Sequence, residues 1–177
     1  MPLPDHPIIE INRAPVLTLW ATVVAERLGF NHEEALTLGK AIAGLNAQSK
    51  GRRLGIFHPV EAAPNLKASR QAGDRHQVDL LGRSVTIEQT ADGARAVIKE
   101  ELIHPDSVET YLEGKFGEHL GAARKAMAAL ANRVPPEELA RTAFGLSEQF
   151  RPAIPAGVMG WGAKGKLDLG FIASLGA

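Results

Sequence analysis

The spacing of apolar residues changes in the middle of this chain, and that change restricts the fold more than any other feature. Residues 77–101 alternate between apolar and polar side chains, most clearly around Val85 and Ile87. Such a two-residue period is typical of strands with one buried face. Leu81-Gly82 and Ala91-Asp92-Gly93 interrupt the pattern as turns, the second as a three-residue hairpin loop with glycine where φ is positive. We therefore expect a small antiparallel β-meander.

The segment before this meander has helical periodicity instead. Residues 15–29 place apolar side chains on one stripe and end in a glycine, which indicates an amphipathic helix. A second helix is expected to begin at Asn31, because Asn31 and Glu34 have the spacing of a capping box. The chain is thus predicted to be α+β, mostly α-helical, with a small antiparallel β-meander in the middle.

The second helix combines an apolar stripe with unusually small neighbours. Ala35, Leu38, Ile42 and Leu45 recur with heptad-like spacing. The small residues are Gly39, Ala41, Ala43, Gly44 and Ala47. Small side chains let helix backbones approach closely, either within the fold or between two copies of the chain. We expect a homodimer or another homo-oligomer on this basis.

Two further helices are expected after the meander. One runs from Asp106 or Ser107, as its cap, to about residue 132 and is weakened in its middle by glycines. The other begins at the Pro-Pro-Glu-Glu sequence of residues 135–138 and ends near Phe150. The remaining residues form a glycine-rich tail, whose apolar side chains are expected to dock on the helices. These are Met159, Trp161, Leu167 and Leu169.

These elements divide the chain into three parts. Residues 1–50 form the helical pair, 51–76 a connecting segment with prolines and glycines, and 77–177 the meander, helices and tail. The first and third parts are also compatible with one compact domain, because 177 residues are an ordinary size for a single domain.

Composition restricts the class of protein. Twenty acidic residues balance twenty basic ones, so no overall field attracts nucleic acid or an anionic membrane. The absence of cysteine removes disulfides and thiolate metal sites. The start of the chain lacks the basic region of a signal peptide, and its apolar runs are shorter than the ~20 residues that span a bilayer. We expect a cytoplasmic protein without membrane contact.

The stretch from Ser49 to His76, which is the connecting segment with the two residues before it, contains the one marked charge imbalance in the sequence. Two acids, Glu61 and Asp74, accompany six basic residues, namely Lys50, Arg52, Arg53, Lys67, Arg70 and Arg75. These cations are candidates for contact with nucleic-acid phosphates. A solvated loop, with a basic last turn on the second helix, is the alternative. The two N-terminal helices also have the order of a helix-turn-helix, but Glu33 and Glu34 lie where such a recognition helix meets DNA.

The tail contains a second candidate site, for an anion. Gly160, Gly162 and Gly165 match a dinucleotide-binding pattern, and Gly160, Gly165 and Lys166 match most of a phosphate-binding loop. Both assignments fail, because neither the following elements nor the magnesium-binding hydroxyl is present. What remains is an anion site at Gly160, Gly162, Lys164, Gly165 and Lys166, with His104 or His119 nearby.

Catalytic and metal-binding signals are weak. Glu101, His104 and Asp106 approach the composition of a metal site, but Pro105 prevents the helical spacing that the site needs. Glu118 and His119 are adjacent and therefore diverge on a helix. Ser147 has no strained turn to expose its hydroxyl. We predict no metal and no cofactor, and whether the chain catalyses a reaction stays open.

The sequence thus favours a non-catalytic binding or regulatory module. It is predicted to self-associate and to contact nucleic acid through the basic connecting segment. The alternative is a protein or enzyme that binds a small anionic ligand with its tail.

Overall fold

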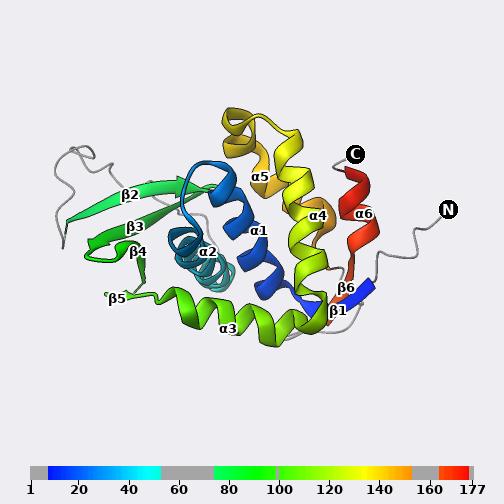
Figure 1. Cartoon of the computed structure of the whole chain (residues 1–177), viewed down its shortest axis with the longest axis horizontal. Helices are drawn as coiled ribbons and strands as arrows, with labels where there is room; N and C mark the ends of the chain where they lie inside the picture. The colour runs from blue at the N-terminus through cyan, green and yellow to red at the C-terminus, as the bar shows by residue number, and fades with distance from the viewer. Residues whose placement is uncertain (1–7, 53–73, 99, 153–163, 176–177) are drawn as a thin grey trace.

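The computed structural model describes residues 8–52, 74–98, 100–152 and 164–175, with side chains of the second helix described as far as Leu45. The helices are α1 (Arg13–Arg27), α2 (His32–Arg52), α3 (Pro105–Phe116), the short 3₁₀ helix η1 (Gly117–His119), α4 (Leu120–Arg133), α5 (Pro136–Phe150) and α6 (Leu169–Leu175). The strands are β1 (Ile8–Asn12), β2 (Arg75–Leu80), β3 (Arg83–Thr90), β4 (Gly93–Ile98), β5 (Glu101–Leu102) and β6 (Lys164–Asp168). The predicted α+β, mostly helical fold is confirmed (Figure 1).

The β-meander lies where the alternating pattern predicted it. Its antiparallel strands have the order β2-β3-β4-β5. Leu81 and Gly82 both have positive φ, 50° and 77°, as the tight two-residue turn between β2 and β3 requires. Gly93 has a φ of 123° as expected, but it already pairs with Thr90, so the second loop is one residue shorter than predicted.

The expected capping box at the start of α2 is half formed. The backbone N–H of Glu34 donates to Oδ1 of Asn31 at 2.9 Å. The carboxylate of Glu34 does not turn back to the helix start. It accepts a hydrogen bond from the backbone N–H of Ala94 in β4, at 3.2 Å. The contact with β4 therefore takes the place of the second capping-box hydrogen bond, in which the Glu34 carboxylate would accept from the Asn31 backbone N–H.

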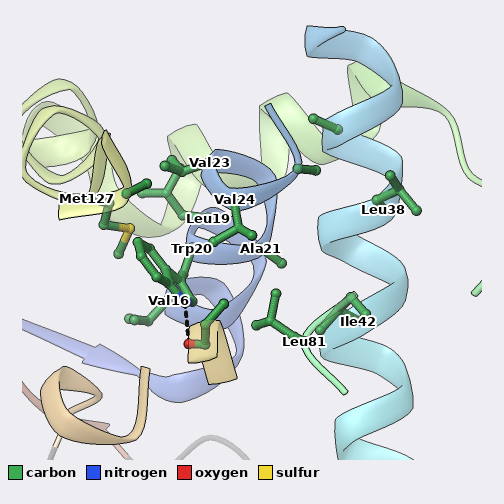
Figure 2. Close-up of a cluster of buried hydrophobic side chains, with 14 of the residues drawn as sticks. Val16, Leu19, Trp20, Ala21, Val23, Val24, Leu38, Ile42, Leu81 and Met127 are labelled. Carbon is green, nitrogen blue, oxygen red and sulfur yellow. Dashed lines mark hydrogen bonds between the residues drawn. The ribbon is translucent and has the colours of Figure 1, made fainter. Parts of the chain in front are cut away.

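The small residues of α2 serve close packing inside the chain. A Cβ atom added at Gly39 would clash with the Thr22 side chain and would lie 2.5 Å from the Thr18 carbonyl oxygen, both in α1. Leu38 and Ile42 of the heptad-like stripe are buried in the core of the chain, where Figure 2 shows both on α2. A dimer of two chains would therefore need a different surface.

Trp20 connects α1 to α5 in the same core. Its side chain is fully buried, and its indole N–H donates to the Ala143 carbonyl oxygen at 2.9 Å, the dashed line in Figure 2. Its ring also meets the Phe150 ring edge-on, with centroids 5.2 Å apart. Buried residues from β1 to α6 form one hydrophobic cluster among the described residues, and α1 and α2 contribute to it together with the later helices and strands.

The long helix expected after the meander is broken, as its glycines predicted. α3 ends at Phe116, and Gly117 has a φ of 57°, outside the helical region. The helix cap differs from the prediction: His104 is the cap residue, followed by Pro105 in the first turn. Ser107 supports this start differently, since its hydroxyl donates to the His104 carbonyl oxygen at 2.8 Å.

Strands β1 and β6, far apart in the sequence, form a two-stranded antiparallel ribbon that was not among the predicted elements. β1 pairs with β6, with Ile9 opposite Leu167 and Ile11 opposite Gly165. The ribbon lies at the opposite end of the molecule from the meander (Figure 1). Leu167 and Leu169 are fully buried, as predicted for the tail. Met159 and Trp161 lie outside the described residues.

Candidate nucleic-acid interface

Helix α2 separates its charges along its length. Its acidic residues, Glu33 and Glu34, both lie in the first turn. From Ala35 to Arg52 the helix contains no acid, and its cations are Lys40, Lys50 and Arg52. The C-terminal half of α2 thus contains two cations, both near its end, and no acid.

The acidic end of α2 is held against strand β4. Nη2 of Arg95, whose side chain is nearly buried, lies 3.1 Å from Oε1 of Glu33. Thr37 Oγ1 accepts a hydrogen bond from the Ala96 backbone N–H at 3.0 Å. Together with the bond from Ala94 to Glu34, these contacts satisfy donors at the edge of β4. The start of α2 is therefore engaged with the sheet, which leaves its C-terminal half as the candidate for contact with a partner.

Two of the six basic residues predicted to contact phosphates belong to this end of α2. Lys50 and Arg52 lie in its last turns, where the structure gives the backbone alone. Arg53, Lys67 and Arg70 lie outside the described residues.

Arg75, the last of the predicted set, lies in β2 and is already paired with carboxylates. Its guanidinium lies 2.9 Å from Glu88 and 3.1 Å from Glu100. Hydrogen bonds to Glu88 and then Glu100 raise the pKa of Arg75. Because two carboxylates neutralise its charge, Arg75 is a poorer phosphate ligand than its sequence position suggested.

A second candidate group, which we call the Tyr111 cluster, consists of two cations, Lys40 and Lys115, and the aromatic ring of Tyr111. Lys40 of α2 places its ammonium 4.2 Å from the centroid of the Tyr111 ring, and Lys115 of α3 lies 6.0 Å from the same centroid. Burial raises the pKa of the half-buried Tyr111. The sequence alone does not indicate this cluster, because its members come from two helices separated by the meander. The one local signal was the i, i+4 spacing of Tyr111 and Lys115.

The tail residues proposed as an anion site are partly in a strand. Lys164 and Lys166 are exposed on β6, opposite Asn12 and Glu10 of β1, and Gly165 between them is buried. An extended backbone does not curve its amides around one anion as a nest does. Exposed lysines on a short edge strand are typical of protection against strand pairing between molecules. Gly160 and Gly162 lie outside the described residues.

The histidines named above as candidates occupy separate places. His104 caps α3, with Glu101 before it in β5 and Asp106 after it in the first turn. His119 lies in η1 with its Nε2 3.8 Å from Glu118. Within residues 8–52, 74–98, 100–152 and 164–175, no three potential ligands gather as a metal ion requires.

His32, at the start of α2, contacts carboxylates on two other helices. Its Nδ1 lies 2.5 Å from Glu26 of α1, and its Nε2 lies 3.1 Å from Glu109 of α3. Glu109 also lies 3.5 Å from Arg124 of α4. The hydrogen bond with Glu26, followed by that with Glu109, raises the pKa of His32 against the opposing effect of burial. The two carboxylates lie at different ring nitrogens, so this group connects helices rather than forming a metal site.

Ser147 has a structural role in α5. Its side chain is buried, and its hydroxyl donates to the Phe144 carbonyl oxygen at 2.6 Å. Back-bonding of this kind occupies the hydroxyl within its own helix.

Comparison with protein-family models, curated proteins and solved structures found no significant match to the chain. Among the described residues, no helix is both long enough and apolar enough to cross a membrane.

Proposed function

We propose that this chain is a non-catalytic binding module that contacts the phosphate backbone of nucleic acid through the C-terminal half of α2 and the basic residues that follow it. The observation that carries the proposal is the charge separation along α2. Its two acids contact β4, whereas the charged residues later in the helix are all cations, among them Lys50 and Arg52. Arg53 continues the basic sequence.

Contacts of this kind explain how a chain of zero net charge binds a polyanion. Each lysine or arginine that neutralises a phosphate releases condensed counterions, so local charge determines affinity. Such contacts are independent of base sequence. The proposal therefore predicts binding that depends strongly on salt and weakly on sequence.

The test is fluorescence anisotropy of a labelled duplex titrated with the protein from about 50 to 200 mM salt. The triple variant K50Q/R52Q/R53Q should bind more weakly, and its slope of log affinity against log salt should decrease by about 0.9 for each phosphate that the protein no longer neutralises. The matched control is K125Q/K164Q/K166Q, which removes three exposed lysines from α4 and β6. This control should bind like the wild type.

The control also tests the alternative of an anion site in the tail. Loss of binding in the control, with the α2 triple variant unaffected, would favour Lys164 and Lys166 as the anion-binding residues. A wild type that shows no binding at about 50 mM salt would refute the proposed function. The basic residues at the end of α2 would then act only through their favourable interaction with the helix dipole.

Self-association remains a proposal, but the surface that first suggested it is not available to a second chain. The stripe that suggested it, including Leu38 and Ile42, is buried within the chain. A dimer that binds DNA would double the number of phosphate contacts. Sedimentation at micromolar concentration tests this point, and a monomer at every concentration would rule it out.

A further inference from the structure

We infer that the Tyr111 cluster is a second phosphate-binding point that acts together with the C-terminal half of α2. This inference rests on the proposed function and adds Lys40 and Lys115 to it as phosphate ligands. The cluster brings two cations to one aromatic ring, at 4.2 and 6.0 Å from its centroid.

The positive charge of this cluster is uncompensated in the described part of the chain. Neither Lys40 nor Lys115 has a carboxylate partner there, although other cations do. The acids of α3 do not reach the cluster readily, because Glu109 and Glu113 lie on the opposite side of the helix from Tyr111 at about 100° per residue. Glu109 is also engaged by His32 and Arg124. The charge is therefore available to an anion.

The aromatic ring restricts the motion of the lysine side chains before an anion binds. A free lysine loses up to about 2 kcal/mol of rotamer entropy when it is fixed. Contact with the Tyr111 face restricts the Lys40 ammonium in advance and leaves its N–H donors for other oxygens. Preorganisation of this kind lowers the cost of binding. A phosphodiester has two unesterified oxygens that share one negative charge, and both can accept hydrogen bonds from the two ammonium groups and the phenol hydroxyl.

The spacing along α2 suits one nucleic-acid molecule. Lys40 and Lys50 are ten residues apart on a continuous helix, which corresponds to about 15 Å at about 1.5 Å per residue. Phosphates of one strand in a duplex are separated by about 3.4 Å along the axis, so about four to five steps cover this distance. The Tyr111 cluster and the end of α2 are thus able to contact the same short stretch of backbone.

The test measures duplex binding by the full chain carrying K40Q/K115Q, beside K40R/K115R and the control K125Q. The Gln variant should lose roughly tenfold or more in affinity at about 50 mM salt, and its salt slope should decrease by about 0.9, because the two lysines neutralise one phosphate. The Arg variant keeps both charges and should retain the wild-type slope. Y111L, which removes the ring but no charge, should weaken binding without changing the slope.

The outcomes separate this inference from the proposed function. If the wild type binds and K50Q/R52Q/R53Q reduces binding, but K40Q/K115Q keeps the wild-type slope, this inference alone is wrong. If the wild type does not bind, both are wrong. If the Gln variant loses its helical circular dichroism signal, the single variants K40Q and K115Q replace it, and wild-type salt slopes in both would overturn the inference.

Discussion

Replacement of Gly39 by alanine tests the close packing of α1 on α2 most directly. Gly39 lies in the interior of α2, where its missing side chain lets α1 approach. An added Cβ would overlap the hydroxyl oxygen of Thr22 and would lie 2.5 Å from the carbonyl oxygen of Thr18. These two atoms are joined by a hydrogen bond of 2.8 Å, so the methyl group would enter a contact that is already formed.

The expected magnitude follows from two opposing effects. Alanine is favoured over glycine in a helix interior by about 1 kcal/mol. Overpacking a filled core costs about 1–3 kcal/mol, and here one of the overlapping atoms belongs to the backbone and yields little. We expect G39A to lower the free energy of unfolding by about 1–2 kcal/mol. At about 2–4 °C per kcal/mol for a chain of this size, the melting temperature should fall by about 2–8 °C.

The assay is urea unfolding followed by circular dichroism, with Gly145→Ala as the matched control. Gly145 is also interior to a helix, α5, and a Cβ there meets nothing within 4 Å. G145A should therefore gain about 0.5–1 kcal/mol. The reasoning is refuted if G39A is as stable as the wild type while G145A shows its expected gain.

Three further predictions concern single contacts. Because its carboxylate partners raise the pKa of His32 above 6.5, its stabilising effect should be present below about pH 6.5 and disappear as the pH rises through the raised value. H32Q should thus destabilise the protein more at about pH 5.5 than at about pH 8.5 in urea unfolding, and an equal loss at both would contradict this. W20F removes the donor to the Ala143 carbonyl oxygen and part of a buried ring, and should cost about 2 kcal/mol by the same assay; a loss below about 0.5 kcal/mol would show the bond to be unimportant. Gly117→Ala places a side chain at a φ of 57° and should cost about 1–3 kcal/mol, whereas Gly121→Ala in open space should be neutral or stabilising; similar melting temperatures for the two would falsify the strain argument.

The parts of the fold that local sequence determines were predictable. The meander follows from alternating apolar residues and two turns, and the break at Gly117 follows from the weak helix propensity of glycine. The β1–β6 ribbon was not predictable in this way. Ile9 and Ile11 do alternate with polar residues, but their partner strand reads locally as a glycine loop. Its strand conformation depends on the pairing itself.

The pairing of charges in the candidate interface was likewise not predictable from the sequence alone. Counting basic residues treated Lys50, Arg52 and Arg75 as equivalent candidates. The register of the sheet places Glu88 directly opposite Arg75, and no composition count contains that information. The approach of Lys40 to Tyr111 is likewise set by the packing of α2 on α3. Net local charge becomes informative only after tertiary structure has paired some of the cations.

The pairing of β1 with β6 has a consequence for synthesis of the protein. Partners in the ribbon are 152 to 160 positions apart in the chain, as in Asn12 with Lys164 and Ile8 with Asp168. A ribosome that adds about 5–20 residues per second needs roughly 8–30 s between them. During that time β1 has no strand partner, and Ile9 and Ile11 lack the cover of Leu167. We expect nascent chains that end before β6 to be sensitive to protease at their N-terminal segment and to bind chaperones there, and to lose both properties once β6 has left the ribosome.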